Sequence, residues 1–152
     1  FFANPSKPTQ PLGFISADLE WVKYAGTRFY SNDNNQDVVS YYNDLNYVIK
    51  NTYKNNINIR IGSEVKLNGN WMARAGTAYY GSPYKDGGLK ASQFIISGGI
   101  GYRTEKHFID FTIMNTMVKD AIFPYRLTEK SSYYADYKGN NLMFNIGYGI
   151  RF

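Results

Sequence analysis

The sequence predicts an all-β chain that folds as an antiparallel transmembrane β-barrel. Three observations predict this fold: apolar and polar residues alternate in several segments, short turns alternate with long polar loops, and aromatic residues gather near segment ends. Alternation with a period of two puts successive side chains on opposite faces of a β-strand. The whole chain, residues 1–152, is predicted to form a single domain.

The composition limits the alternatives. The chain has 15 Tyr and 10 Phe but no Cys, which excludes disulfide frameworks and thiolate metal sites. It has no apolar run of about 18 residues, so no transmembrane helix is predicted. The net charge is +5, but the basic residues are scattered along the alternating segments and form no cluster. No nucleic-acid partner is therefore predicted.

Alternation predicts six strands, each with one apolar face. They cover residues 13–24, 57–67, 71–80, 94–103, 107–116 and 140–152. The second is the clearest, because Ile57, Ile59 and Ile61 alternate with polar residues and glycine. These lengths match the roughly 9–11 residues that a tilted strand needs to cross a bilayer.

The connections between these strands alternate in length. Residues 68–70 and 104–106 are predicted to be hairpin turns. The other three connections, residues 25–56, 81–92 and 117–140, are long and polar, and a short helical turn is predicted within the first. Short turns at one end and long loops at the other are typical of outer-membrane barrels, whose short turns are periplasmic.

The polar face of the strands is predicted to line the barrel lumen. Keeping like faces together across residues 68–70 pairs Leu67 with Trp71 and places Glu64 opposite Arg74. Facing side chains in such a pair have Cβ atoms about 5 Å apart, so Glu64 and Arg74 should form an ion pair. The predicted lumenal charge network contains Asp18, Glu20, Arg60, Glu64, Lys66, Arg74, Arg103, Asp110 and Arg151. Its predicted role is to brace the wall, with substrate gating as the alternative.

Aromatic residues near strand ends on the apolar face predict contact with both membrane interfaces. The predicted interfacial aromatics are Trp21, Trp71, Tyr79, Tyr102 and Tyr148. A soluble, lipocalin-like barrel with an apolar cavity is the alternative. These aromatics, the glycines on the polar face and the final Phe152 argue against it, because glycine fits a crowded lumen better than a solvated strand face.

Several segments, in order, resemble the C-terminal part of the FadL/TodX family, especially its Bacteroidetes members. They are "GFISADLEWVKY", an R-x-G-x-E strand at Arg60, Gly62 and Glu64, an R-A-G strand at 74–76, "GGIGYR" followed by Ile-Asp, and the terminal "LMFNIGYGIRF". The resemblance extends from about Gly13 to Phe152. It implies the outer membrane of a Gram-negative bacterium and a barrel of about 14 strands.

The family resemblance also implies a function and partners. It implies passive uptake of hydrophobic compounds such as long-chain fatty acids or aromatic hydrocarbons, without a cofactor. The family's hatch and roughly its first eight strands have no counterpart here, so the chain is expected to be a fragment and no ligand-binding residue is carried over. The terminal strand resembles the signal read by the barrel-assembly machinery, with Tyr148, Ile150 and Phe152 as its residues.

Two further function classes were weighed. An accessory or structural barrel would bind a protein partner, for example in a secretion complex, and the 25–56 loop is long enough for such a contact. An enzyme is not predicted, because the only histidine, His107, lies at a short turn and fits an interfacial position. No metal site is predicted either, since Asp33, Asp37 and Asp44 lack calcium-loop spacing.

Overall fold

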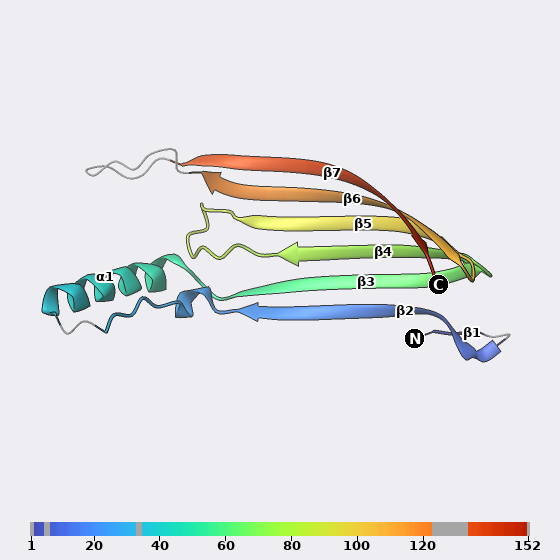
Figure 1. Ribbon diagram of the computed structural model, residues 1–152. Coiled ribbons are helices and arrows are strands. Elements are labelled where there is room, and N and C mark those ends of the chain that lie inside the picture. The colour runs from blue at the N-terminus through green and yellow to red at the C-terminus, as the bar shows by residue number, and fades with distance from the viewer. Residues whose placement is uncertain (1, 5–6, 33–34, 123–133, 152) are drawn as a thin grey trace.

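The computed structural model describes residues 2–4, 7–32, 35–122 and 134–151, which form one antiparallel β-sheet with one helix beside it. The seven strands lie in the sheet in chain order (Figure 1). They are β1 (Phe2–Asn4), β2 (Lys7–Val22), β3 (Asn56–Asn68), β4 (Trp71–Tyr80), β5 (Ser92–Arg103), β6 (His107–Ile122) and β7 (Ala135–Ile150). The prediction of an all-β, antiparallel chain is confirmed.

The connections differ between the two ends of the sheet, as predicted. The β3–β4 and β5–β6 hairpin turns lie at one end, here called the turn end, together with both chain termini (Figure 1). The long connections and the helix α1 (Gln36–Thr52) lie at the other, here called the loop end. Every strand from β2 to β7 therefore runs between the turn end and the loop end.

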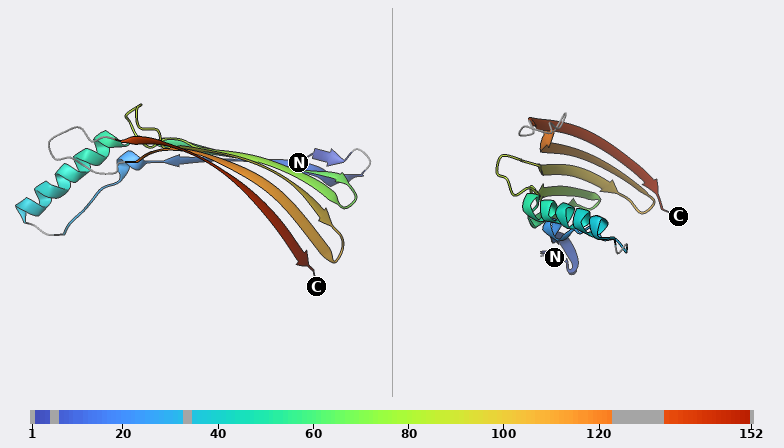
Figure 2. Two further views of the ribbon diagram at one scale, coloured as in Figure 1. Left: turned by 90° about the horizontal axis from the view of Figure 1, so that it is seen from above. Right: turned by 90° about the vertical axis from the view of Figure 1, so that its left-hand side faces the viewer.

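The sheet is curved and open. Seen along the strands it forms an arc, and β7 lies far from the first strands (Figure 2). Among the described residues, strand pairing runs from β1 to β7, and β1 and β7 are not paired with each other. The described residues therefore form a section of curved wall and do not close into a barrel by themselves.

The predicted strand boundaries were too short at several points. β2 begins at Lys7, β6 continues to Ile122, and β7 begins at Ala135. The predicted connection 117–140 is therefore much shorter, and residues 123–133 lie outside the described part. Alternation fades in these extensions, whereas backbone pairing continues, with Lys119 opposite Lys138 and Ile122 opposite Ala135. The last strand ends at Ile150, and Phe152 lies outside the described residues.

The β3–β4 turn gives one correction to the predicted register. Glu64 does face Arg74, but Trp71 faces Asn68 and not Leu67, because the register shifts between Lys66 and Asn68. The tight turn requires Gly69 to adopt a positive φ of 38°, which glycine does without steric cost. The turn thus takes up one extra residue on β3, and the pairing further along the strands is unaffected.

The predicted short helical turn is instead a helix of 17 residues, α1. Asn35 caps its N-terminus by accepting a hydrogen bond from the Asp37 N–H at 3.0 Å. Leu45 and Ile49 are half-buried, while no residue of the helix is fully buried. The prediction missed this length although the half-buried Val38, Tyr42, Leu45 and Ile49 recur at helical spacing, which is the signal that was available.

No second layer covers the sheet in the described part of the chain. The helix α1 packs mainly against the short 3-10 turn η1 (Tyr24–Gly26) and extends beyond the strand ends (Figure 2). Among described residues, the only buried apolar side chains are Met72 and Ala121. No helix in the described ranges is both long and apolar enough to cross a membrane. The section therefore lacks the interior core of a folded two-layer domain.

Candidate functional site: two opposed faces of one sheet

One side of the sheet, here called the apolar face, exposes large hydrophobic side chains on almost every strand. Register places Ile61, Thr77 and Ile96 in one cross-strand row, and Ile113 beside Phe144 in the next. Leu19 is 70% exposed and Ile146 is 75% exposed. Such a continuous apolar surface is unusual on a protein that faces water on that side.

The opposite side, here called the polar face, is more enclosed although it carries the charges. The side chains of Glu64 and Asp110 are 19% and 21% exposed. In a curved sheet, side chains converge on the inner side and spread apart on the outer side. The difference in exposure therefore makes the polar face the inner side of the arc.

Arg74 is the centre of an ion-pair cluster on the polar face. Its Nε donates to Glu64 Oε2 at 2.7 Å, and its Nη1 donates to Asp110 Oδ1 at 2.7 Å. Its Nη2 also lies 3.2 Å from Met72 Sδ. Arg74 thus joins β3, β4 and β6, and the predicted Glu64–Arg74 ion pair is confirmed.

Two glycines allow Arg74 to reach Asp110 across β5. Gly99 lies opposite Arg74, and Gly101 lies opposite Asp110. A Cβ at Gly101 would lie 2.5 Å from Asp110 Oδ1, and a Cβ at Gly99 would lie 2.8 Å from the Phe111 carbonyl oxygen. Any larger residue would therefore press on Asp110, Met72 or the β6 backbone beside this ion pair.

Arg60 organises a second and more exposed cluster nearer the loop end. Its guanidinium donates to Glu20 Oε2 at 2.6 Å, to Asp18 Oδ1 at 3.4 Å and to the Tyr80 hydroxyl at 3.2 Å. The amide of the buried Asn58 donates to the same Glu20 oxygen at 3.2 Å. The sequence predicted the three charged members but missed Tyr80 and Asn58, whose polar-face positions were the available signal.

The remaining members of the predicted charge network are not joined to these clusters. Lys66, Arg103 and Arg151 make no ion pair with any described residue. Arg103 instead lies over the Phe108 ring, 5.9 Å from its centroid. The structure therefore contains two separate clusters, around Arg74 and Arg60, and no continuous network of nine residues.

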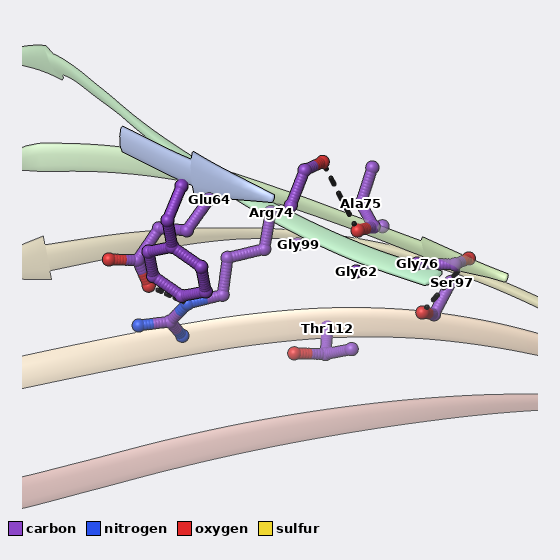
Figure 3. Close-up of a pocket in the computed structure, with 11 residues that line it drawn as sticks. Gly62, Glu64, Arg74, Ala75, Gly76, Ser97, Gly99 and Thr112 are labelled. Atoms are coloured by element: carbon purple, nitrogen blue, oxygen red, sulfur yellow. Dashed lines mark hydrogen bonds and ion pairs between the residues drawn. The ribbon is translucent and has the colours of Figure 1, made fainter. Parts of the chain in front are cut away.

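A hollow of about 300 Å³ lies on the polar face beside Arg74 (Figure 3). Its floor is made of small residues, including Gly62, Gly76 and Gly99, and the Glu64–Arg74 ion pair borders one side. Ser97 and Thr112 contribute hydroxyl groups. The hollow can hold a small molecule or a side chain from another segment, with hydrogen-bonding groups available on two of its sides.

The predicted interfacial aromatics fall near the two ends of the apolar face. At the turn end Trp71 faces Tyr102, with ring centroids 4.9 Å apart, and Tyr148 lies in the same cross-strand row through Ile109. At the loop end Trp21 and Tyr79 are both exposed. His107 stacks on Tyr148 at 6.0 Å, and its Nδ1 lies 2.9 Å from the Tyr148 hydroxyl.

A second hollow, of about 460 Å³, lies at the loop end and is lined mostly by apolar groups. It is bordered by Tyr24, Thr27, Phe29, Ile49, Tyr53 and Pro83. Asn46 holds Phe29 in place, because its side chain accepts from the Phe29 N–H at 2.7 Å and donates to the Phe29 carbonyl at 3.0 Å. This hollow was not predicted, because its lining comes from three segments that are separate in the sequence.

The loop-end hollow is stabilised by a latch between two connections. Tyr53 pairs with Tyr84 in an isolated β-bridge, and their rings stack at 5.5 Å. The Lys54 N–H donates to the Pro83 carbonyl at 2.7 Å, and the Lys85 N–H donates to the Thr52 carbonyl at 2.9 Å. The segment after α1 is therefore fixed to the β4–β5 connection.

The described side chains do not assemble a metal centre, because nowhere in these ranges do three or more His, Asp or Glu residues gather in suitable positions. The two clusters contain Arg and carboxylates that satisfy one another, without a nucleophile and base pair. No protein-family model, curated protein or solved structure was found to match this chain.

Proposed function

We propose that this chain is a section of an outer-membrane β-barrel of a Gram-negative bacterium that passes hydrophobic compounds into the cell by diffusion. In this proposal the apolar face contacts lipid and the polar face lines the lumen. The barrel is a member of the FadL/TodX family with about 14 strands. Its cargo is long-chain fatty acids or aromatic hydrocarbons.

The observation that carries the proposal is the inverted exposure of the two faces. Large apolar side chains are exposed on the outer side of the curved sheet, while the charged side chains of the Arg74 cluster are enclosed on its inner side. A sheet in water would place these residues the other way round, because burying apolar area is the main favourable term in folding. Lipid on the outer side removes the contradiction.

The loop-end hollow supports an apolar cargo. Its lining of aromatic and aliphatic groups is suited to an alkyl chain or a ring, and it opens at the end where the long connections gather. Binding sites for apolar compounds are lined mainly by such side chains. A compound could be collected there before it enters the lumen.

Membrane placement can be tested with single cysteines, since the chain has none of its own. Ile96→Cys lies on the apolar face and Ser97→Cys lies beside the polar hollow. In proteoliposomes, a water-soluble maleimide should label Ser97→Cys and leave Ile96→Cys unlabelled. Fast labelling of both positions, or of Ile96→Cys alone, would contradict the placement.

The cargo can be tested by uptake of a radiolabelled long-chain fatty acid into cells. Phe29→Ser removes a ring from the loop-end hollow, whereas Tyr30→Ser alters a neighbour that is 84% exposed and does not line it. Uptake should fall several-fold in the first variant and stay at the wild-type rate in the second. Equal uptake in both variants would exclude the hollow as a site on the cargo's route.

A second candidate function is an accessory barrel that binds a protein partner. The exposed side of α1 carries Tyr41, Tyr47 and Val48, which favours contact with another molecule. Replacing Tyr41 and Tyr47 with serine should then abolish partner recovery and leave fatty-acid uptake intact. The opposite pattern would favour the transport function.

A further inference from the structure

Two lysines face each other at the loop-end border of the apolar face. Lys119 on β6 lies directly opposite Lys138 on β7, and both are exposed. Residues two apart share a face, so this pair stands on the same side as Met117. Facing Cβ atoms lie about 5 Å apart, and like charges at this distance destabilise a sheet. The pair is a position where an anion would be stabilising.

The described neighbours do not supply that anion. Neither lysine takes part in any of the four ion pairs of the described residues. Asp136 is on the same side, one row further from the apolar face and opposite Ala121. Asp120 is on the other side, where its carboxylate accepts from the Ala121 N–H. On β5, Ser92 faces Lys119 and adds a hydroxyl to the row.

The surface next to the lysines is suited to acyl chains. Moving along the strands away from the loop end, the rows are Met117 with Asn140, Asn115 with Leu142, and Ile113 with Phe144. Consecutive rows are about 7 Å apart along the strand. Leu142 and Phe144 are 53% and 59% exposed. A cationic border is thus followed by two rows that mix an asparagine with an apolar residue and then by an open apolar surface, so charge and apolar area are arranged as in an amphiphile.

We propose that Lys119 and Lys138, assisted by Ser92, bind the phosphate headgroup of an anionic membrane lipid whose acyl chains lie on the apolar face. This inference rests on the proposed contact of that face with lipid, and it concerns a lipid partner that is distinct from the transported compound. A lysine also lies at the loop end directly after β2, where Lys23 Nζ lies 4.8 Å from the Trp21 ring centroid. Lysines at this border can extend their charge toward headgroups while their stems stay on apolar surface.

The test uses the full chain in a non-ionic detergent, titrated with a short-chain phosphatidic acid and followed by native mass spectrometry. The double variant K119Q/K138Q should bind this lipid roughly 30-fold more weakly, because each surface lysine contributes about fivefold to the affinity. The control K54Q/K106Q removes the same charge at exposed positions away from this row and should keep the wild-type affinity. Circular dichroism checks that both variants keep their β-sheet.

Three results would overturn the inference. The first is an equal loss of affinity in both double variants, which would mean that only net charge matters. The second is equally tight binding of inorganic phosphate, which would remove any role for the acyl chains. The third is equally tight binding of phosphatidylcholine of the same chain length.

Failure of the lipid site and failure of the transport function can be told apart. K119Q/K138Q leaves the loop-end hollow intact and should retain fatty-acid uptake. Loss of selective lipid binding in a protein that still takes up fatty acid would count against the lipid site alone. Selective lipid binding by a protein without uptake activity would count against the transport function alone.

Discussion

The two faces of the sheet are built from the same strands but differ in how their side chains are packed. On the polar face, charged groups are brought close together, so they pair with one another over glycines that leave room for them. On the apolar face, large side chains stand apart and are covered by nothing in the described part of the chain. The contacts of the polar face therefore depend on the space available and on charge pairing. Those of the apolar face depend on the surrounding medium.

The two faces also differ in exposure. Met72 on the inner face is 6% exposed, whereas Ile146 on the outer face is 75% exposed. An apolar side chain beside the Arg74 cluster is thus buried, whereas one on the apolar face of β7 is open.

The largest effect is expected from a charge on the apolar face. Ile113→Arg should lower the free energy of unfolding in lipid vesicles by roughly 2–4 kcal/mol, because in the proposed placement a cation would enter the hydrocarbon layer. Its neighbour Thr112 lines the polar hollow, so Thr112→Arg has space and polar partners. Urea titration of both variants measures the difference. Similar losses at the two positions would refute the assignment of the faces.

Removal of the central guanidinium comes next. Arg74→Met leaves the enclosed carboxylates of Glu64 and Asp110 without their donor, and it should cost about 2 kcal/mol of unfolding free energy. The same urea titration measures it.

Arg60→Met is the matched control for Arg74→Met. Its partners Asp18 and Glu20 have side chains that are 60% and 46% exposed, and exposed ion pairs contribute less than about 1 kcal/mol. Equal losses of unfolding free energy in Arg74→Met and Arg60→Met would contradict the stronger enclosure of the Arg74 cluster. A double variant of Glu64→Ala with Arg74→Ala that is as stable as the wild type would also remove the bracing role of that pair.

Adjacent glycines on β5 compare the space on the two faces directly. A Cβ at Gly99 would press on the Phe111 carbonyl, so Gly99→Ala should cost about 1–2 kcal/mol of unfolding free energy. A Cβ at Gly98, on the apolar face, would have its nearest neighbour at 3.9 Å. Gly98→Ala should therefore be neutral or slightly stabilising. Stability curves in urea would contradict the inner crowding if the order were reversed.

The sequence predicted the faces and most of the register because both follow from a period of two. Glu64 faces Arg74 since the alternation on both strands leaves one pairing that keeps apolar residues together. The predicted pairing of Leu67 with Trp71 was wrong, because the conformation of Gly69 and its neighbours shifts the register by one residue at the turn. Turn geometry is not encoded in the pattern of faces.

Contacts between residues far apart in the sequence could not be predicted from the alternation of apolar and polar residues. The contact of Arg74 with Asp110 spans 36 residues and depends on two glycines of a third strand. The loop-end hollow depends on Asn46 bonding to Phe29 and on Tyr53 stacking on Tyr84. Such contacts depend on how connections fold back, which local alternation does not specify.

The smallest expected effect concerns the latch at the loop end, which belongs to neither face and should respond to pH. Burial raises the pKa of the Tyr84 hydroxyl above its ordinary value of 10.0, and the nearby Tyr53 and Asp120 raise it further. An acid whose pKa is raised in the closed state stabilises that state fully below pH 10.0. This stability is lost as the pH rises through the higher pKa of the closed state, because the open state ionises first.

A spin label at Tyr47, on the exposed side of α1, should therefore become more mobile when the pH is raised above about 10. Tyr84→Phe keeps the ring that stacks on Tyr53 but removes the ionisable hydroxyl. Its label should keep the same mobility over that range. An identical rise in mobility in both proteins would mean that ionisation of a group other than the Tyr84 hydroxyl opens the latch.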